Sequence, residues 1–524
     1  MATLVINTSG AGTGTLTLAA NTAPISTLTL AGNGAQPITL SGINSATTSA
    51  FVLNDSVTGA SGGAQTVTAF ALSAAPSFTI NDSSTKGLTI ATFTDTSLVS
   101  SALSNTGTAT LTVSGLVNTA ANVFTTLTLT GSGAETVTAL TFAGNTSGNL
   151  VINDSNTGTV TLSAISEAAR TTGNLTVTNS GNGNLVISTL VDAATVAGTD
   201  SFINQGSGTF SVTMTGGAGE VTSAATLNFT ATSGLMILGG GAFTDNFATS
   251  INLTNNVSGF SIADSVTTGV TITQTGANAN PVAVSLSGTN TVANTYNLGT
   301  VTGGVTIAGG AGVDTMTVGN GTNTLTPGAG NDAITLATTH TNATTISQTT
   351  AVNNGTDTYA NFIPGTDVFN LSIGGTISVG GTVITPVWNG LTAGGKTAAP
   401  GTFTAAIAIL VPSVEATATT TAAATFTTGN QVLVLSGTLI KSTTDLAAAV
   451  KAALTVGALG AQRLDELVLW SDGVNSYLSD VSTTTHVAAA TVLTGDTVTA
   501  TNLVQFTGVT TTAGFTAAGL TFIA

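Results

Sequence analysis

Cysteine is absent from this sequence, and charged residues of either sign are scarce. Without cysteine the chain has neither disulfides nor thiolate metal ligands. Charged residues make up only 5% of the chain, far below the roughly 25% of an ordinary soluble domain. Lysine and arginine together number 6 against 22 aspartates and glutamates, which gives a net charge of −16. A nucleic acid or an anionic membrane needs a basic patch, so we expect no nucleic-acid partner.

Long apolar segments are missing as well. The N-terminus, MATLVINTSGAG, has no basic region followed by an apolar core, so no cleavable signal peptide is predicted. No run approaches the roughly 18 apolar residues that a membrane-spanning helix needs. We therefore expect a protein that either stays in the cytoplasm or leaves the cell by a route that recognises another part of the chain.

Recognisable catalytic motifs are also lacking. His340 and His486 are the only histidines, and neither lies in a catalytic spacing. The sequence contains no HExxH, no GxSxG and no P-loop. Its six basic residues are too dispersed to bind phosphates together, so we expect no enzyme. A carboxylate pair of the kind that glycosidases use stays open as an alternative, because a solenoid can hold one in a groove.

What the first three hundred residues do contain is a repeated unit of apolar–x–apolar followed by Asn, Asp, Ser or Gly. Its starts are 23 to 27 residues apart, in the range expected for stacked repeats. The alternation predicts half-buried strands, and the polar cluster after it is typical of turns. The repeats begin at Leu4, Leu28, Phe51, Phe78, Leu103, Leu127, Leu150, Leu175, Phe202, Leu227 and Ile251.

The simplest structure for such a repeat is a parallel β-solenoid in which each unit forms one coil. Leu, Ile, Val and Phe would then line the interior, and ladders of threonine would face outward. A series of β-sandwich domains is the alternative, since it also gives short strands with frequent turns. The near-constant period favours the solenoid.

Residues 309–335 divide into three nonapeptides, GGAGVDTMT, VGNGTNTLT and PGAGNDAIT. The first matches the pattern G-G-x-G-x-D-x-U-x at every defined position, where U is a large apolar residue. This block resembles the RTX (repeats-in-toxin) calcium-binding repeat. The resemblance implies a β-roll in which two nonapeptides complete one coil, so that Asp314 and Asp332 would lie on the same edge, one coil apart.

A Ca²⁺ ion between those two turns is expected to take both carboxylates and backbone carbonyls of the glycine-rich turns, which positive φ angles at the glycines would aim inward. Met316, Leu325 and Ile334 would stack as a thin core. Asn323 replaces the aspartate of the middle repeat, which weakens the opposite edge, and Tyr296 is expected one coil before Asp314. The predicted metal residues are Gly310, Gly312, Asp314, Gly328, Gly330 and Asp332.

Other aspartates lie in similar turn contexts. Asp55 and Asp82 occupy equivalent places in neighbouring repeats, and two interpretations are open for them: solvated turn residues, or ligands of a Ca²⁺ ion between coils. The remaining candidates are Asp154, Asp264, Asp357 and Asp367.

The C-terminal region is predicted to be rich in strands, with one helix over 443–455 that Ser442 would cap. A hairpin turn is expected at Asp472 and Gly473. The ending, with FTGV at 506–509 followed by Leu520, Phe522, Ile523 and Ala524, resembles the uncleaved secretion signal of RTX surface-layer proteins. That resemblance implies export by type I secretion machinery, which would explain the missing N-terminal signal.

Taken together, the patterns predict an all-β protein with three regions: a β-solenoid over 1–300, an RTX block over 301–340 and a β-rich C-terminal domain over 341–524. The resemblance implies a secreted structural subunit of a bacterial surface layer (S-layer), which forms a two-dimensional homo-oligomeric lattice with extracellular Ca²⁺. It also implies an anchor on the cell surface, either a glycan or lipopolysaccharide. The alternative is a secreted adhesin or extracellular enzyme that uses the nonapeptides only for export and folding.

Overall fold

The structure is a computed structural model, and contacts between residues divide it into two units, Met1–Asn280 and Pro281–Ala524. The two units are described one at a time. The structure describes residues 2–9, 16–18, 24–34, 38–58, 64–95, 99–118, 125–142, 149–166, 173–191, 198–213, 226–239, 243–245, 249–264, 269–286, 290–348, 355–372, 377–379, 382–384, 424–425, 433–434, 440–455, 464–483, 497–512, 514–515 and 520–523.

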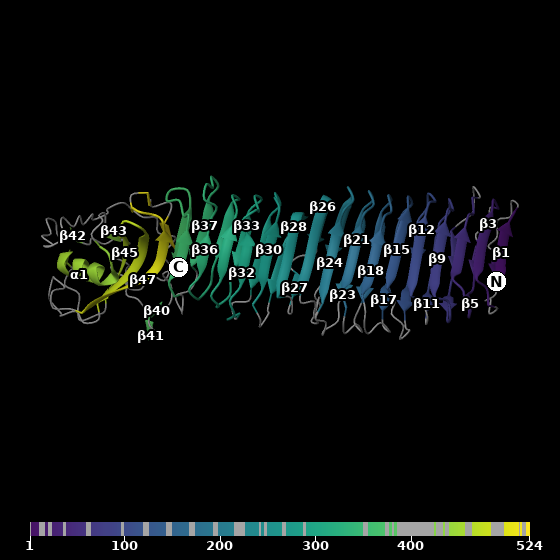
Figure 1. Cartoon of the computed structure of the whole chain (residues 1–524), viewed down its shortest axis with the longest axis horizontal. Helices are drawn as coiled ribbons and strands as arrows, with labels where there is room; N and C mark the ends of the chain where they lie inside the picture. The colour runs from purple at the N-terminus through teal and green to yellow at the C-terminus, as the bar shows by residue number, and fades with distance from the viewer. Residues whose placement is uncertain are drawn as a thin grey trace. The chain divides into compact units, whose positions relative to one another are not determined.

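The first unit is a parallel β-solenoid whose coils have up to three strands. Strands at equivalent places in successive coils pair in parallel, and Figure 1 shows them side by side in chain order from β1 to β30. The first face contains the longest strands: β1 (Thr3–Thr8), β3 (Thr27–Gly32), β6 (Phe51–Asp55), β9 (Ser77–Asp82), β12 (Ser100–Asn105), β15 (Thr126–Gly131), β18 (Leu150–Asp154), β21 (Leu175–Asn179), β24 (Thr199–Asn204), β26 (Thr226–Gly239), β28 (Ser250–Ser258) and β30 (Thr271–Thr275).

Shorter strands form the two other faces. The second face contains β2 (Leu16–Leu18), β4 (Ile38–Leu40), β7 (Gln65–Val67), β10 (Leu88–Ile90), β13 (Leu111–Val113), β16 (Glu135–Val137), β19 (Val160–Leu162), β22 (Leu185–Ile187) and β25 (Thr209–Thr213). The third face contains β5 (Ile43–Ser45), β8 (Phe70–Leu72), β11 (Phe93–Asp95), β14 (Leu116–Asn118), β17 (Leu140–Phe142), β20 (Ile165–Ser166) and β23 (Leu190–Val191). In a further sheet, β27 (Phe243–Asp245) pairs in parallel with β29 (Phe260–Asp264).

The prediction of a parallel solenoid is confirmed, and the sandwich alternative is wrong for this unit because sandwich strands pair antiparallel. Every second side chain of a strand points inward, and most of these inward residues are the predicted Leu, Ile, Val and Phe. Aromatic rings from the first and third faces meet inside the coil. Phe51 and Phe70 have ring centroids 5.0 Å apart, and Phe78 and Phe93 are stacked at 4.6 Å.

In some coils the strands pair so that the starts of two successive sequence repeats lie opposite each other. In others the pairing is offset from the repeat starts by two residues. Leu28 pairs with Leu53 rather than with Phe51, the start of the next repeat, and Leu127 pairs with Ile152 rather than Leu150. A shift of two keeps every side chain on its own side of the strand, whereas a shift of one would turn the core outward. The repeat spacing of 23 to 27 residues can therefore vary without disturbing the interior.

The corner between the first and second faces is a close stack of glycines. A Cβ atom on Gly183 would lie 1.9 Å from the carbonyl oxygen of Gly158, one coil earlier. A Cβ atom on Gly208 would lie 1.9 Å from the carbonyl oxygen of Gly183. Glycine is needed at these corners because the backbones approach too closely for any side chain.

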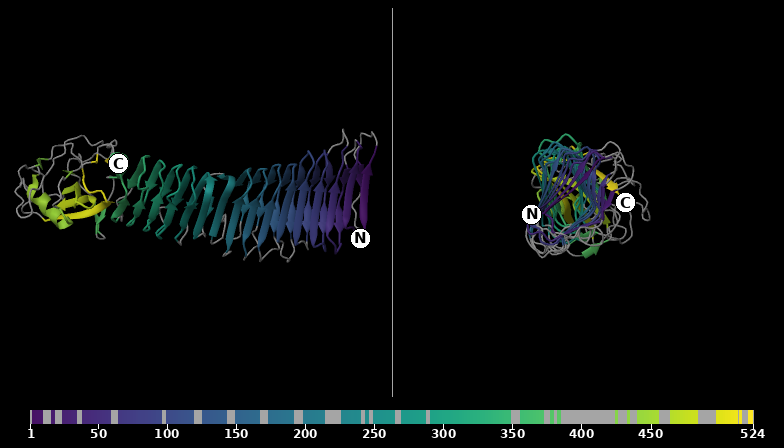
Figure 2. Two further views of the ribbon diagram at one scale, coloured as in Figure 1. Left: turned by 45° about the horizontal axis from the view of Figure 1, so that its top comes forward. Right: turned by 90° about the vertical axis from the view of Figure 1, so that its right-hand side faces the viewer.

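The second unit begins with a coil of two strands. One face contains β32 (Thr295–Leu298), β34 (Thr315–Val318), β36 (Ala333–Thr335) and β38 (Asp357–Ala360), and the other contains β31 (Val282–Leu286), β33 (Val305–Ala308), β35 (Asn323–Thr326), β37 (Thr344–Gln348) and β39 (Val368–Ser372). Figure 2 shows the same strands turned about the horizontal axis.

The predicted coil of eighteen residues is present where the nonapeptides lie. Met316 pairs with Ile334, eighteen positions later, while Leu325 lies on the opposite face, and all three side chains are buried. The prediction for Tyr296 is wrong. The preceding coil has twenty residues, so Tyr296 pairs with Met316 in the core, and Asn294 takes the place one coil before Asp314.

The last coil of this unit is completed by strands from much later in the chain. β47 (Val498–Thr507) pairs in parallel with β38, and β48 (Leu520–Ile523) pairs in parallel with β39. Phe506, Thr507 and the strand Leu520–Ile523 therefore belong to the solenoid stack, Gly508 and Val509 follow the end of β47, and Ala524 lies outside the described residues. On its other side β47 pairs antiparallel with β46 (Ser476–Thr483), which covers its edge.

The remaining elements of the second unit include the predicted hairpin and helix. β45 (Leu464–Ser471) and β46 form an antiparallel hairpin, with Asp472 and Gly473 in the turn as predicted. The helix α1 spans Thr443–Ala453, and the backbone N–H of Asp445 donates to the Ser442 hydroxyl, which confirms the cap. Its predicted end at 455 is too late, because β44 (Leu454–Thr455) follows and pairs with β42 (Ala424–Thr425). β43 (Leu433–Val434) pairs with β45, and β40 (Ile377–Val379) with β41 (Thr382–Ile384).

Within the described part of the chain, no helix has the length and apolar character needed to cross a membrane. The division after Asn280 follows contacts, and the three regions predicted from the sequence remain an interpretation of its patterns.

Candidate functional site

Three buried aspartates form a column along one edge of the second unit. The register of β34, β36 and β38 places Asp314, Asp332 and Asp357 at successive coils. Asp332 Oδ1 accepts the backbone N–H of Asp314 at 2.8 Å, and Asp357 Oδ1 accepts that of Asp332 at 2.9 Å. Each carboxyl thus satisfies the backbone donor of the coil before it. The sequence predicted the proximity of Asp314 and Asp332 but missed Asp357 as the third member, because the intervening coil has 25 residues.

The column starts at Asn294. Its backbone N–H and its side-chain amide both donate to Asp314 Oδ1, at 2.9 and 2.8 Å. Asp314 Oδ2 accepts the backbone N–H of Gly310 at 3.3 Å. Asparagine in a polar turn gives no signal of this role in the sequence, because only the twenty-residue coil brings it opposite Asp314.

Burial, with no cationic partner among the described residues, makes these carboxyls difficult to ionise. Desolvation, and then the charge of Asp357, raise the pKa of Asp332 to about 8. Desolvation raises the pKa of Asp357 to about 7 and shifts that of Asp314 upward as well. Asp332 Oδ2 is buried and has no hydrogen-bond partner among the described residues. The column is therefore an acceptor-rich edge that either protons or a cation would stabilise.

The glycines predicted to line this edge are needed chiefly for close approach. The φ angle is positive at Gly328 (107°) and Gly330 (129°), as expected, but it is not positive at Gly310 or Gly312. A Cβ atom on Gly328 would lie 1.9 Å from the carbonyl oxygen of Gly310, and one on Gly330 would lie 2.4 Å from that of Gly312. The turns stack directly on one another, and the Gly310 carbonyl accepts the N–H of Ala329 at 3.0 Å.

The donor set fits calcium in its chemistry. Ca²⁺ binds carboxylate and carbonyl oxygens, and this edge offers the unpaired Asp332 Oδ2 and, in the turns before Asp314 and Asp332, closely stacked glycines with their carbonyls. Across the described residues, no group of three or more His, Cys, Asp or Glu side chains is placed to hold a metal ion. A calcium ion bound here would therefore depend on backbone carbonyls for most of its ligands.

The opposite edge has an uncharged counterpart. Asn323 Oδ1 accepts the backbone N–H of Val305 at 3.0 Å, and its amide donates to the carbonyl of Gly319 and to the hydroxyl of Thr344. Every hydrogen-bonding atom of this side chain is used within the protein. The substitution of Asp by Asn in the middle repeat thus removes a charge while keeping the contact between coils.

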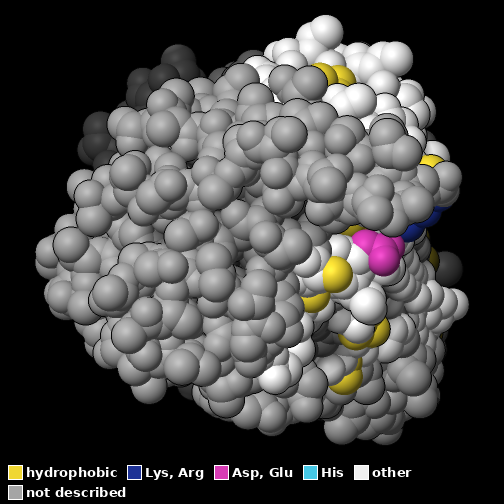
Figure 3. Space-filling model, turned by 90° about the vertical axis from the view of Figure 1, so that its left-hand side faces the viewer, with side chains coloured by type: hydrophobic (Ala, Val, Ile, Leu, Met, Phe, Trp, Pro, Cys, Tyr) yellow, Lys and Arg dark blue, Asp and Glu magenta, His cyan; other side chains and the backbone are white. Residues whose placement is uncertain are grey.

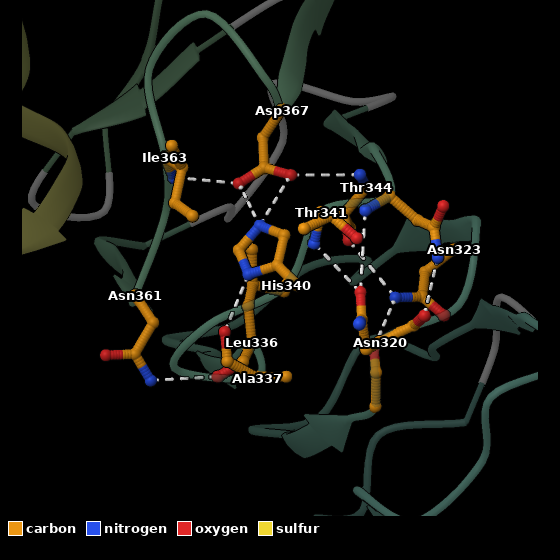
Figure 4. A network of polar contacts seen from close by, with 12 residues as sticks. Asn320, Asn323, Leu336, Ala337, His340, Thr341, Thr344, Asn361, Ile363 and Asp367 are labelled. Atoms are coloured by element: carbon orange, nitrogen blue, oxygen red, sulfur yellow. Dashed lines mark hydrogen bonds and ion pairs between the residues drawn. The ribbon is translucent and has the colours of Figure 1, made fainter.

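A histidine that the sequence pattern did not single out for a role lies at the next turn. Figure 4 shows His340 between the Ala337 carbonyl and the carboxyl of Asp367. Its Nδ1 lies 2.6 Å from that carbonyl oxygen, and its Nε2 lies 2.9 Å from Asp367 Oδ2. Because a carbonyl only accepts, Nδ1 is the donor to Ala337, and Nε2 faces the carboxyl of Asp367.

Asp367 is also held by two backbone donors. The N–H groups of Thr344 and Ile363 donate to its two oxygens, at 2.9 and 2.8 Å. With the imidazole in place, each oxygen has two contacts, and the side chain is fully buried. Asp367 therefore closes the turn around His340, and we do not expect it to bind calcium.

The first unit has its own interior column of aspartate and asparagine. Asp55 pairs with Asp82, and Asp82 with Asn105, at the end of the first-face strands. Farther along, Asp154 pairs with Asn179. The carboxyls of Asp55, Asp82 and Asp154 are buried rather than solvated. Because asparagine takes the same place in neighbouring coils, we interpret this column as a turn-capping feature rather than a set of calcium ligands.

The geometry of this column is repeated from coil to coil. Oδ1 of Asp55, Asp82 and Asp154 accepts the N–H two residues later, at 3.1, 2.8 and 2.8 Å, while Oδ2 has no partner in the described parts of the chain. Desolvation raises the pKa of Asp55 to about 7, of Asp82 to about 6 and of Asp154 to about 7. Asp264 lies in β29, and its side chain is outside the described residues.

Glu135 adds a fourth buried carboxyl beside this column. Its Oε1 accepts the backbone N–H of Asn105 at 2.9 Å, one coil earlier. Desolvation is the main cause that raises its pKa to about 9, and the nearby Asp154 adds to the shift.

Surface charge is sparse wherever side chains are described. Figure 3 shows one face of the molecule, on which a magenta acidic group and a dark blue basic group lie close together among yellow hydrophobic and white uncharged groups. His486 and three basic residues, Arg170, Lys396 and Arg463, lie outside the described residues.

The chain matches no protein-family model, and neither the curated proteins nor the solved structures contain a match to it.

Proposed function

We propose that this protein is a secreted structural subunit of a bacterial surface layer, and that its second unit takes up Ca²⁺ at the edge formed by Asp314 and Asp332. The observation that carries the proposal is the construction of the first unit. Its coils repeat along one direction, most of their inward residues are buried and apolar, and the outward residues are mainly threonine, serine and asparagine. Such a unit is suited to span a distance and to present a regular surface.

Calcium would supply the positive charge that the aspartate column lacks. Asp314 and Asp332 would hold it together with carbonyls of the stacked glycine turns. Inside the cell, where Ca²⁺ is scarce, the buried carboxyls oppose folding unless they are protonated. Outside the cell, extracellular calcium sites with dissociation constants of about 0.1–1 mM would add about 1.4–2.7 kcal/mol at 10 mM Ca²⁺.

Export through type I machinery and anchoring to a surface glycan or lipopolysaccharide belong to the same proposal. They rest on the resemblance of the C-terminal sequence and of the nonapeptides. Removing residues 498–524 should keep the protein inside the cell, and normal export of the shortened chain would contradict this route. In the structure these residues include β47 and β48, so that experiment also needs a folding control, such as Tyr359→Ala in the full chain, which removes a ring that packs on Phe506 and leaves residues 498–524 unchanged.

Two measurements test the proposal. The purified protein should form ordered sheets in electron micrographs when millimolar Ca²⁺ is added and should disperse with a chelator. A protein that stays dispersed at every calcium concentration would contradict the surface-layer role and favour a secreted adhesin or enzyme.

The calcium site has its own control. Asp332→Asn should remove most of the stabilisation that Ca²⁺ gives to thermal unfolding at neutral pH. Asp445→Asn makes the same chemical change at an exposed turn of α1, where Asp445 accepts the backbone N–H of Lys441, and should leave the calcium effect unchanged. An equal calcium effect in both variants would place the ion elsewhere.

A further inference from the structure

The second face of the first unit carries an uninterrupted ladder of one residue type. From β2 to β19 the middle residue of each strand is threonine in every coil, and from β4 onward its side chain faces outward. The register pairs each of them directly with the next: Thr17, Thr39, Thr66, Thr89, Thr112, Thr136 and Thr161. From Thr39 onward, each of these threonines is half-exposed.

A second column runs beside the ladder, two residues further along each coil. It is exposed or half-exposed and consists of small residues, nearly all with a hydroxyl group. Its members are Ser41, Thr68, Ala91, Ser114, Thr138, Ser163 and Ser188. The backbone N–H of Thr68 donates to the carbonyl of Leu40, and that of Thr138 to Val113, so this column is stacked between coils as regularly as the first.

The other two faces of the same unit show whether β-sheet propensity alone would give a uniform column of threonine. Their outward residues need the same β-sheet propensity, yet they vary from coil to coil. On the first face one column reads Thr29, Asn54, Asn81, Ser104 and Thr130. On the third face the column reads Asn44, Ala71, Thr94, Val117, Thr141 and Ser166. Sheet propensity alone therefore does not account for the uniform ladder.

We propose that the threonine ladder of the second face is a contact surface for a second copy of this chain. The inference rests on the proposed function, because it assigns the lattice contact that a surface layer requires. A partner that recognises a row of identical groups must repeat with the same spacing, which is about 4.8 Å between paired strands. The solenoid itself is a partner with that spacing.

The chemistry of the ladder suits contact between identical surfaces. A hydroxyl both donates and accepts, so two threonine rows can hydrogen-bond to each other without complementary charges. The methyl groups add apolar contact. The chain carries a net charge of −16, which opposes self-association, but neither column contains a charged residue. Contact through this face therefore avoids the repulsion between like charges.

The size of the surface predicts a weak contact. Five steps of about 4.8 Å between Thr39 and Thr161, with columns about 7 Å apart, give an area of roughly 170 Å². A stable pair of proteins needs about 800 Å² on each partner. The ladder contact is thus expected to persist only where many copies act together in an array, and the protein should be monomeric in dilute solution.

A single coil provides the matched experiment. Thr79 in β9, Thr89 in β10 and Thr94 in β11 face outward from the three faces of one coil, and all are half-exposed. Thr89→Glu should raise the protein concentration needed for calcium-induced sheets by about tenfold or more, because it sets like charges opposite each other. Thr79→Glu and Thr94→Glu should assemble as the unchanged protein does. Circular dichroism and thermal unfolding should show that all three variants are folded.

Cross-linking tests the contact without requiring sheets, and so separates its failure from that of the proposed function. The chain contains no cysteine, so Thr89→Cys, Thr79→Cys and Thr94→Cys each introduce one reactive group. With a long flexible bismaleimide at high protein concentration, T89C should form dimers about tenfold faster than the other two. Equal rates for all three, or sheets of T89E at the normal concentration, would overturn the proposal.

Ordered water is the other partner that a regular hydroxyl surface could bind. If the unchanged protein restricts the growth of ice crystals, T89E does not, and T89C cross-links only at the rate of the controls, the surface binds ice and not a second copy. That outcome would also overturn the proposal.

Discussion

Replacing Asp154 by asparagine is expected to stabilise the first unit at pH 8 and to change its stability much less at pH 4. Burial raises the pKa of the Asp154 carboxyl from 3.8 to about 7. A group whose pKa is raised on folding contributes stability that is complete below its unfolded pKa and is lost as the pH rises through the folded one. Here that window runs from about pH 4 to about pH 7.

The magnitude follows from the shift. About three pKa units at 1.36 kcal/mol each give an upper limit of about 4 kcal/mol for the cost of ionising this carboxyl in the fold. Asp154→Asn removes that cost and keeps the oxygen that accepts the N–H of Asn156 at 2.8 Å. At the equivalent place in the next coil, the amide of Asn179 donates to the carbonyl of Gly183, four residues later, at 3.3 Å. The new amide should reach Gly158 in the same way.

Hydrogen exchange is the suitable assay, because an array of repeats need not unfold in one step. The opening free energy of amides in β18 and β21 should rise by about 2–4 kcal/mol in Asp154→Asn at pH 8. At pH 4 the change should be within about 1 kcal/mol, the usual net value of one hydrogen bond. Comparing the two proteins at each pH cancels the contributions of distant carboxyls. A gain of equal size at both pH values, or a loss at pH 8, would refute the reasoning.

Three further predictions follow from contacts described above. Gly183→Ala should destabilise the first unit by about 2 kcal/mol or more, because its Cβ would meet the Gly158 carbonyl at 1.9 Å. Gly115→Ala, where no atom lies within 4 Å of the added Cβ, should leave thermal unfolding nearly unchanged, and equal losses would disprove the explanation by close approach. Asp367→Ala should destabilise the second unit by about 3 kcal/mol, measured by urea unfolding, because it leaves His340 and two backbone donors buried without an acceptor; a loss below about 1 kcal/mol would contradict that role. Without calcium, the unchanged protein should lose stability in urea between pH 5 and 8, since the buried aspartates ionise there, and a rise over that range would contradict their burial.

The parts of the fold that depend on alternation and period could be predicted from the sequence. Runs such as LVIND show which residues face inward, and their recurrence fixes the stacking. The third face could not be predicted in the same way, because its strands of two or three residues are too short to show alternation. The cap at Ser442 and the turn at Asp472 were predictable, since each depends on local hydrogen bonds.

The candidate site was predictable only where the coil length is constant. Asp314 and Asp332 are eighteen residues apart within three uninterrupted nonapeptides, so their proximity follows from counting. Asn294 and Asp357 lie beyond coils of twenty and twenty-five residues, and counting by eighteens misplaces both. The burial of Asp55 and Asp82 was equally hidden, because a polar turn residue that caps an interior corner has the same local sequence as one in solvent.

The variation in coil length has a practical side. The chain leaves the stack after Ser372, forms a helix and a hairpin, and rejoins it in register at β47. A segment with its own helix and hairpin is thus inserted at a corner between two strands, and the strands on either side of the insertion keep their order in the stack. Engineers who wish to display a foreign peptide or an enzyme at regular intervals along such a rod should therefore choose the corners as insertion points, and leave the strands alone.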